Sequence, residues 1–300
     1  MKILLLGKNG QVGWELQRSL ACLGELIALG SDSREICGDL SRPDELSATV
    51  RALRPDVIVN AAAHTAVDKA EGEPDRATLL NATAPTVLAR EAQALGAWLV
   101  HYSTDYVFDG SGDSPWREND PTGPVSVYGT SKLAGEQAIQ ATAARHLILR
   151  TSWVYGARGG NFAKTMVRLA REREALTVID DQFGAPTAAE LLADVTAHAV
   201  RQALRDDRVA GLYHVAAAGE TTWHGYACFV LETVQGLGMA LKAGPQQVRA
   251  VPTSGFPTPA RRPNNSRLDT HKFRETFGMV LPPWQDGVRR MLSESFTPAS

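Results

Sequence analysis

The sequence predicts an α/β protein in which a parallel sheet is covered by helices on both faces. Three observations predict this class. A glycine-rich turn follows a short apolar run at the start of the chain, apolar runs alternate with helical stretches up to about residue 151, and each run ends in small or polar residues. Strands that alternate with helices pair in parallel, and their carboxyl ends form the usual ligand edge of such sheets.

The first unit of this pattern is a strand, a turn and a helix. Lys2–Leu6 is apolar, as in a buried parallel strand, and Trp14–Leu20 has helical apolar spacing. The turn between them has the spacing GxxGxxG, which lets a backbone approach a pyrophosphate at a helix N-terminus. We therefore expect a Rossmann-type dinucleotide site, although glycine-rich turns also occur in ordinary loops. Its expected cofactor-binding residues are Gly7, Gly10, Gln11, Val12 and Gly13.

The following units repeat the alternation. Further strands are expected at Leu26–Leu29, Val57–Ala61, Trp98–Ser103 and Leu147–Thr151, and helices at Asp44–Leu53, Ala77–Leu95 and Val127–Ala143. The strand ends should line one crevice, because the carboxyl ends of parallel strands meet at one edge of the sheet.

The pattern loosens after Trp153, and proline and glycine gather in Pro252–Pro263. We expect residues 1–152 to form the dinucleotide-binding domain, with a returning element near 188–216 that includes a strand near Gly211–Val215. Residues 153–187 and 217–300 are expected to form a smaller carboxyl-terminal, substrate-binding region over the crevice.

Composition excludes several classes of function. The net charge of −2 and the absence of a basic stripe argue against nucleic-acid binding. The three cysteines form no CxxC pair and their odd number argues against a disulfide framework, so a reducing cytoplasm is expected. The sequence begins directly with the first strand and contains no apolar stretch of membrane-spanning length, so neither a signal peptide nor membrane insertion is expected.

Tyr128 and Lys132 lie four residues apart in a predicted helix, which places their side chains on one face. A free phenol has a pKa near ~10, and a neighbouring ammonium is expected to lower it toward the working range. Such a pair can deliver a proton to a carbonyl oxygen or take one from an alcohol. A surface helix with a solvated lysine is the alternative.

Eight segments, one of which contains this pair, carry a wider resemblance. They are GKNGQVGWEL, IVNAAAHTAVDKAE, HYSTDYVFDG, YGTSKLAGE, RTSWVYG, NFAKTM, DQFGAPT and PTPARRPNNSRL, and they extend from residue 7 to residue 268. With these segments the chain resembles the extended short-chain dehydrogenases and, within them, the dTDP-4-dehydrorhamnose reductase family. The resemblance implies an enzyme that reduces the 4-keto group of dTDP-4-dehydro-L-rhamnose to dTDP-L-rhamnose with NADPH or NADH, in polysaccharide biosynthesis.

The same resemblance implies residue roles. Tyr128 would donate the proton, Lys132 would hold the nicotinamide ribose, and Thr104 would hydrogen-bond the reacting oxygen. Gly30, Asp39, Leu40, Ala62, Ala63, His64 and Thr65 would contact the cofactor along with the glycine turn, Tyr128 and Lys132. Thr104, Asp105, Trp153 and Arg262 would contact the dTDP-sugar, where core packing is the alternative for Trp153 and an exposed loop position the alternative for Arg262. Asn81 would orient backbone or water near the crevice, or be an ordinary polar helix position.

One position bears on the choice of cofactor. An acid about 20 residues beyond the glycines normally discriminates against the 2′-phosphate, and this chain has Gly30 where relatives are expected to carry one. Ser31, Ser33 and Arg34 can receive a phosphate, whereas Asp32 opposes it. We therefore expect NADPH to be accepted at least as well as NADH.

The family also implies a magnesium ion held by glutamates between the subunits of a homodimer, with Glu15, Glu190 and Glu294 as candidates. Two other functions stay open at this point. One is a different nucleotide-sugar reductase or epimerase on the same core, and the other is a catalytically silent regulatory subunit. Thr104, Tyr128 and Lys132 together argue against a silent protein, which has no need of an acid–base pair.

Overall fold

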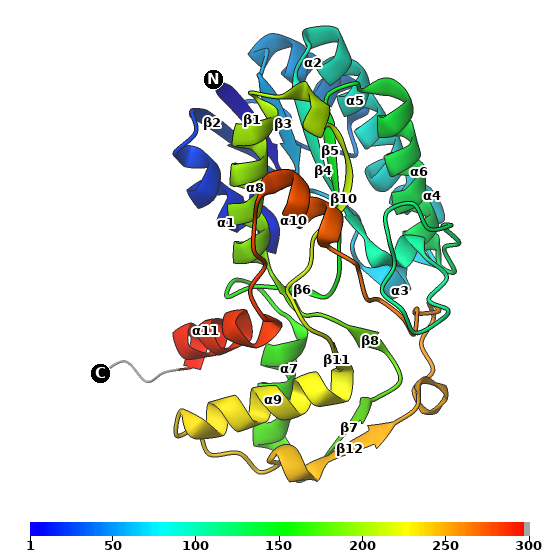
Figure 1. The fold of residues 1–300 in the computed structure, drawn as a ribbon, viewed down its shortest axis with the longest axis vertical. Helices are drawn as coiled ribbons and strands as arrows, with labels where there is room; N and C mark the ends of the chain where they lie inside the picture. The colour runs from blue at the N-terminus through cyan, green and yellow to red at the C-terminus, as the bar shows by residue number, and fades with distance from the viewer. Residues whose placement is uncertain (297–300) are drawn as a thin grey trace.

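A six-stranded parallel sheet forms the centre of the computed structural model, which describes residues 1–296 (Figure 1). The strand order is β10-β5-β4-β3-β1-β2. These strands are β1 (Lys2–Leu6), β2 (Glu25–Leu29), β3 (Val57–Asn60), β4 (Trp98–Thr104), β5 (His146–Thr151) and β10 (Gly211–His214). The α/β class and the strands expected from the sequence are confirmed, with bounds that differ by at most one residue.

Helices cover both faces of this sheet because its strands are apolar on both sides. Alternate residues of β1 divide between two cores: Ile3 and Leu5 face one layer, and Leu4 and Leu6 face the other. The first layer is α1 (Gln11–Ala21), α8 (Ala189–Ala203) and α10 (His271–Phe277). The second is α2 (Pro43–Leu53), α5 (Ala84–Leu95) and α6 (Val127–Thr142).

The segment expected as one helix over Ala77–Leu95 is divided. It consists of α4 (Pro74–Thr78), a π-helical turn η1 (Leu79–Thr83) and α5. The π turn lies against α6, where a Cβ on Gly135 would come within 2.1 Å of the Asn81 carbonyl oxygen. Periodicity in a sequence does not reveal such a turn, because its side chains still follow a helical pattern.

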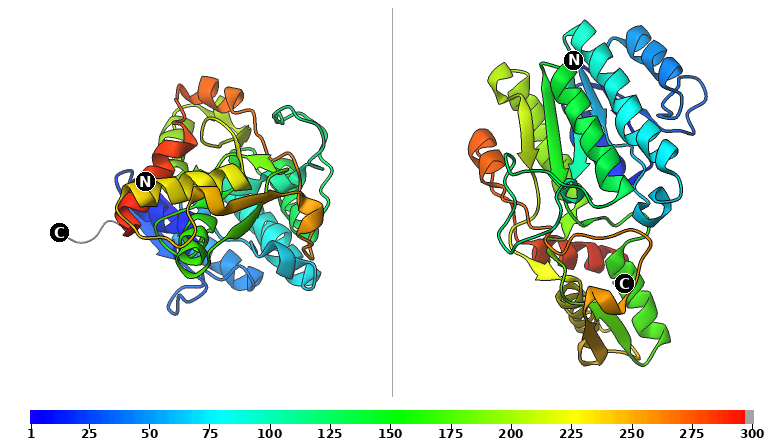
Figure 2. Two further views of the ribbon diagram at one scale, coloured as in Figure 1. Left: turned by 90° about the horizontal axis from the view of Figure 1, so that it is seen from below. Right: turned by 90° about the vertical axis from the view of Figure 1, so that its right-hand side faces the viewer.

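A second, smaller unit lies beyond the carboxyl ends of the sheet strands, in the lower part of Figure 1 and of the right panel of Figure 2. Its own apolar core joins three helices and two pairs of short strands. Its elements are α7 (Phe162–Glu172), α9 (Trp223–Gly236), α11 (Trp284–Phe296), β6 (Val154–Tyr155), β7 (Leu176–Ile179), β9 (Thr187–Ala188) and β12 (Val248–Val251).

The remaining elements are short. They are α3 (Val67–Ala70), β8 (Phe183–Gly184), β11 (Thr221–Thr222), and the 3₁₀ turns η2 (Asp105–Val107), η3 (Asp207–Val209), η4 (Pro245–Gln247) and η5 (Thr253–Gly255). Strand β10 and helix α8 both belong to the sheet layer, as the expected returning element would require. The division into a dinucleotide-binding and a substrate-binding region remains a prediction about function, and residues 297–300 of the latter lie outside the described residues.

One buried ion pair attaches α6 to β5. Arg150 Nε donates to Glu136 Oε1 at 2.9 Å and Nη2 donates to Oε2 at 2.6 Å, and the two residues are 3% and 1% exposed. The pair is bidentate, which holds the helix in one register on the strand. It lies one helical turn beyond Lys132, so it also sets the position of the residues that face the strand ends.

We predict that Arg150→Met lowers the free energy of unfolding by roughly 3–5 kcal/mol, because it leaves the Glu136 carboxylate buried without a partner. The double variant Glu136→Gln/Arg150→Met should recover most of this loss. Urea unfolding measures both changes.

The matched control is Arg168→Ala, which removes the exposed partner of Glu172 on α7. This change should cost less than ~1 kcal/mol. A loss for Arg150→Met no larger than that of the control would contradict the assigned role of the buried pair.

Candidate active site

A cleft of about 830 Å³ opens at the carboxyl ends of the sheet strands. Segments far apart in the sequence form its walls: the glycine turn, the ends of β2 to β5, the start of α6, and Trp223 of the second unit. Most of the expected cofactor, substrate and catalytic residues line it. These are Gly7, Gly10, Gln11, Val12, Gly30, Asp39, Leu40, Ala62, Ala63, Thr65, Thr104, Asp105, Tyr128, Lys132 and Trp153.

The glycine turn is closed by backbone contacts that leave no room for side chains. Gly7 has φ +88°, and a Cβ there would come within 2.7 Å of the Ala62 nitrogen. A Cβ on Gly13 would come within 2.0 Å of the Gly7 carbonyl oxygen, so Gly13 supports the turn from beneath and does not itself line the cleft. The turn leads into α1, whose first N–H groups have no carbonyl partner within the helix. This backbone suits a diphosphate, and the cleft residues therefore fit a dinucleotide.

The end of β3 is held in place by Asn81. Its side-chain oxygen accepts from the His64 N–H at 2.8 Å, and its amide donates to the His64 carbonyl at 3.1 Å and to Ser131 Oγ at 3.0 Å. Asn81 is fully buried, so these bonds fix the backbone that runs along the cleft. The expectation that Asn81 orients backbone is met, whereas the His64 side chain points away from the cleft toward Glu73.

Thr104 and Asp105 lie at the end of β4, where Thr104 caps the turn η2. Thr104 Oγ1 donates to Asp105 Oδ1 at 3.2 Å, and Asp105 Oδ2 is buried with no hydrogen-bond partner. Burial raises the pKa of Asp105 to about 7, against the opposing effect of the Ser266 and Thr104 hydroxyls. The carboxyl can therefore be neutral near neutral pH, and one of its oxygens remains available to a ligand.

Tyr128 and Lys132 both reach the cleft from α6, but they do not interact as the sequence suggested. Lys132 Nζ donates to the Tyr102 carbonyl at 2.6 Å and lies 3.1 Å from His101 Nε2. Burial raises the pKa of Tyr128 to about 12, and the charge of Asp105 adds to this effect. The expected lowering of the phenol pKa by Lys132 is therefore wrong for the protein alone, because the amine is directed to β4. Tyr128 is a neutral phenol, which is the form that can give up a proton.

Trp153 follows β5 with a left-handed backbone, φ +49°, and its indole stacks on Trp223 with ring centroids 3.7 Å apart. Both rings line the cleft, so the packing and ligand-contact roles considered for Trp153 are compatible. Gly184 leaves space for the stack, because a Cβ there would come within 2.7 Å of the Trp153 ring. Trp223 was missed in the sequence, since its place depends on the two-residue pairing of β11 with β8.

Arg262 lies beside the cleft and not on its wall. Its Nη2 donates to Asp68 Oδ2 of α3 at 2.8 Å, whereas Nη1 is buried with no partner. One edge of the guanidinium is thus neutralised and the other retains its donors. The contact of Arg262 with a sugar diphosphate stays a prediction.

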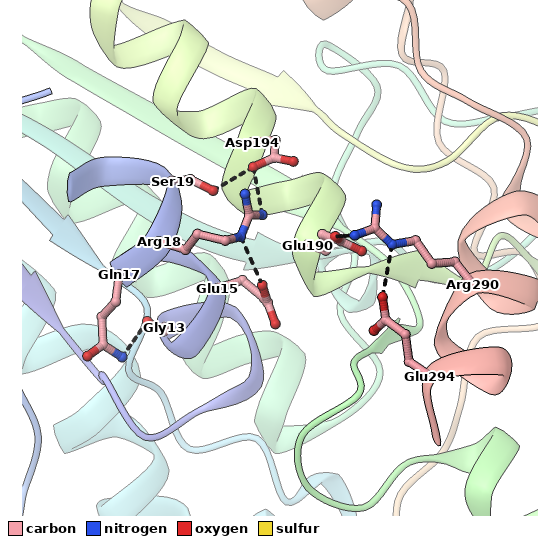
Figure 3. A network of polar contacts seen from close by, with 9 residues as sticks. All are labelled: Gly13, Glu15, Gln17, Arg18, Ser19, Glu190, Asp194, Arg290 and Glu294. Carbon is pink, nitrogen blue, oxygen red and sulfur yellow. Dashed lines mark hydrogen bonds and ion pairs between the residues drawn. The ribbon is translucent and has the colours of Figure 1, made fainter. Parts of the chain in front are cut away.

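The three glutamates expected to hold magnesium lie away from this cleft, around a small pocket between α1, α8 and α11 (Figure 3). Arg290 pairs with Glu190 at 2.8 Å and with Glu294 at 3.1 Å, and Arg18 lies 3.6 Å from Glu15. Arginine cations already occupy the positions next to these carboxylates. Within residues 1–296, no group of three or more histidine, cysteine, aspartate or glutamate side chains is arranged to hold a metal ion. The donor set of the single chain does not fit the expected ion.

The described part of the chain also contains no helix that is long and apolar enough to cross a membrane.

Comparisons with known proteins agree with this arrangement. Residues 1–296 match the family model for the RmlD substrate binding domain. A dTDP-4-dehydrorhamnose reductase from Shigella flexneri is 62% identical over 297 residues, which cover 99% of each chain. A crystal structure of a dTDP-4-dehydrorhamnose reductase from Clostridium acetobutylicum is 34% identical, with a TM-score of 0.88 over 98% of this chain and 99% of that one. The corresponding enzyme from Bacillus anthracis, solved in complex with NADP, is 32% identical with a TM-score of 0.87 over the same shares. This chain belongs to the dTDP-4-dehydrorhamnose reductase family.

Proposed function

We propose that this protein reduces the 4-keto group of dTDP-4-dehydro-L-rhamnose to dTDP-L-rhamnose, with NADPH or NADH as the reductant. The observation that carries the proposal is that Thr104, Tyr128 and Lys132 meet in one cleft with the glycine turn. Reduced nicotinamide supplies a hydride when bound, since no protein side chain can. In the reduction, one hydride is added to the carbonyl carbon and one proton to the carbonyl oxygen.

The residues of the chain supply the proton and hold the oxygen. Tyr128 is a neutral phenol at the wall of the cleft and would donate its proton to the alkoxide oxygen as charge develops there. Thr104 Oγ1 lies at the end of the neighbouring strand and would hydrogen-bond the same oxygen. Lys132 lies near these two residues. One N–H of its amine donates to the Tyr102 carbonyl, and a further N–H would remain available as a donor.

Asp105 and Trp153 would position the dTDP-sugar beside this pair. The free Oδ2 of Asp105 matches a sugar hydroxyl, and the indole of Trp153 offers a flat apolar wall for a deoxysugar. Arg262 would pair with the diphosphate through its free edge. A homodimer and a cytoplasmic location, the latter suggested by three free cysteines, are part of the same proposal.

The direct test of the function is a hydride-transfer assay with keto sugars linked to dTDP, GDP and UDP. We expect stoichiometric consumption of NADPH with the dTDP-keto sugar alone. Isomerisation of a sugar without net oxidation of NADPH would indicate an epimerase, and binding without turnover would indicate a regulatory protein.

Replacing Tyr128 tests the proton donor. We predict that Tyr128→Phe lowers kcat by at least ~10²-fold, the usual scale of general acid catalysis, with little change in the melting temperature. The control Tyr213→Phe removes another buried phenol, one that bonds to the Val209 carbonyl in the sheet layer, and should retain full turnover. Unimpaired kcat in Tyr128→Phe would remove the assigned role.

The raised pKa of Asp105 predicts a pH-dependent stability. The pKa of Asp105 is about 7 in the native state and near 3.8 in the unfolded state, so between these pH values the native state binds a proton that the unfolded state does not. The free energy of unfolding therefore falls as pH rises from about 3.8 through 7. Asp105→Asn should abolish the loss. The stability of the variant relative to the native protein should therefore increase from pH 5 to 7, by roughly 1.4 kcal/mol per unit at most, in urea unfolding.

Asp109→Asn serves as the control for this measurement. A backbone hydrogen bond from Ser111 holds the pKa of Asp109 below its usual value. The difference in the free energy of unfolding between Asp109→Asn and the native protein should therefore not increase from pH 5 to 7. A constant difference between Asp105→Asn and the native protein at all pH values would contradict the shift.

The cofactor preference follows from the end of β2. Gly30 carries no acidic side chain of its own, and a Cβ there would come within 2.6 Å of Asp32 Oδ1, so the Asp32 carboxylate lies next to this position. Asp32 accepts from Asn9, while Lys8 Nζ lies 3.4 Å from Ser33 Oγ. Lys8 and Ser33 thus offer donors to a 2′-phosphate at this strand end, while Asn9 partly compensates the opposing carboxylate of Asp32.

We therefore propose that NADPH is used at least as well as NADH, and predict that Lys8→Gln raises KM for NADPH by ~10-fold with little effect on NADH. The magnitude corresponds to one lost charge-assisted contact of about 1.4 kcal/mol. Steady-state kinetics with both cofactors measures this, with Lys242→Gln in the second unit as a charge-matched control. A hundredfold preference of the native protein for NADH would refute the proposal.

A further inference from the structure

At the wall of the cleft, a series of hydrogen bonds connects three buried side chains. The Ala62 N–H donates to Asn60 Oδ1 at 3.2 Å, and Asn60 Nδ2 lies 3.1 Å from His101 Nδ1. His101 Nε2 lies 3.1 Å from Lys132 Nζ, which donates to the Tyr102 carbonyl at 2.6 Å. Asn60, His101 and Lys132 are 1%, 1% and 2% exposed, so solvent does not compete for these bonds.

The number of hydrogens in this series of bonds determines which atoms donate and which accept. Asn60 Oδ1 faces the Ala62 N–H, so its NH₂ group faces His101 Nδ1, and Nδ1 must accept. A neutral imidazole has one N–H, which is then on Nε2 and points at Lys132 Nζ. An amine nitrogen can accept that hydrogen only when it is uncharged. Burial, the largest cause, holds the pKa of His101 well below its usual value, so a charged imidazolium is not an alternative.

A charged Lys132 requires the opposite arrangement. The ammonium has only donors, so Nε2 must accept and the imidazole hydrogen must move to Nδ1. Asn60 must then turn its oxygen toward Nδ1 and its NH₂ group toward the Ala62 N–H. The bond between Ala62 and Asn60 is lost, and the Ala62 N–H is released at the wall of the cleft.

We propose that Asn60 and His101 are positioning residues that couple the charge of Lys132 to dinucleotide binding. Lys132 is a neutral amine while Asn60 holds the Ala62 N–H, and it takes up a proton when that N–H is engaged by a ligand in the cleft. The inference rests on the proposed function, because it assumes that the cleft binds NADPH.

Other groups around Lys132 define the pH range of the effect. Burial lowers the pKa of Lys132 to about 8, and Glu136 opposes that shift only in part because it is already paired with Arg150. The charged or titratable groups on the surrounding elements are His101 of β4, Tyr128 and Glu136 of α6, Asp105 of η2, Arg150 of β5 and Arg76 of α4. Above pH 7.5 the site changes its charge chiefly through Lys132, since Tyr128 titrates far higher and Asp105 lower.

Proton uptake on binding tests the proposal without reference to turnover. NADPH is titrated calorimetrically into the protein at pH 7.5, 8.0 and 9.0, each in two buffers that differ in protonation enthalpy. A group with a pKa near 8 is half neutral at pH 8, so uptake should be about 0.5 proton per NADPH there and rise toward ~0.9 at pH 9. The 2′-phosphate of NADPH is fully ionised throughout this range and does not contribute.

Two variants remove the coupling by different routes. His101→Gln offers Lys132 a carbonyl acceptor without a tautomer, so the lysine is charged before binding and uptake should fall below ~0.1 proton. Asn60→Asp accepts from both the Ala62 N–H and a protonated Nδ1, which should also abolish uptake. The control His214→Gln removes a buried imidazole that lies against the Trp116 carbonyl and does not contact Lys132, and it should retain the native uptake.

The possible outcomes distinguish a failure of this inference from a failure of the proposed function. NADPH binding without proton uptake in the native protein overturns the coupling, as does full uptake in His101→Gln. A protein that does not bind NADPH contradicts the proposed function instead. Thermal unfolding checks that each variant is folded. If His101→Gln does not fold, the pH series of the native protein and the uptake by Asn60→Asp still show whether NADPH binding is coupled to proton uptake.

Discussion

The attachment of α6 to the sheet determines the geometry of the cleft. Three contacts of different chemistry hold this helix: the Arg150–Glu136 ion pair on β5, the Lys132 bond to the Tyr102 carbonyl on β4, and the close approach of Gly135 to η1. All three lie on one side of the helix. Tyr128, one turn earlier, is therefore carried to the strand ends, where it can meet a ligand that also contacts the glycine turn.

Burial has the same consequence for four titratable groups in this region. It raises the pKa values of Tyr128 and Asp105 and lowers those of Lys132 and His101, so each group is driven toward its uncharged form. A buried site from which water is excluded has a low local dielectric, in which hydrogen bonds to a developing alkoxide are stronger than in water. Tyr128 is thus held in this region as a neutral phenol.

Sequence reasoning predicted the fold and most of the cleft because both depend on local patterns. Strand ends, a glycine turn and an i, i+4 pair are visible in a single sequence, and parallel pairing brings them together. The state of Lys132 could not be predicted in this way. Helical spacing places its side chain on the same face as Tyr128 but does not show that a carbonyl and an imidazole of β4 lie nearer to the amine. His101 itself reads as one more residue of a buried strand.

The residues hardest to predict are those that the second unit brings to the cleft. Trp223 reaches Trp153 only because Thr221–Thr222 pairs with Phe183–Gly184, and no periodicity marks a pairing of two residues. The ion pair that holds Arg262 beside the cleft is equally long-range, because its partner Asp68 lies 194 residues earlier in the chain. The sheet side of the cleft carries the glycine turn, Tyr128 and Lys132, whereas the second unit contributes Trp223. On this side of the cleft, long-range packing and not local pattern therefore determines which side chains meet.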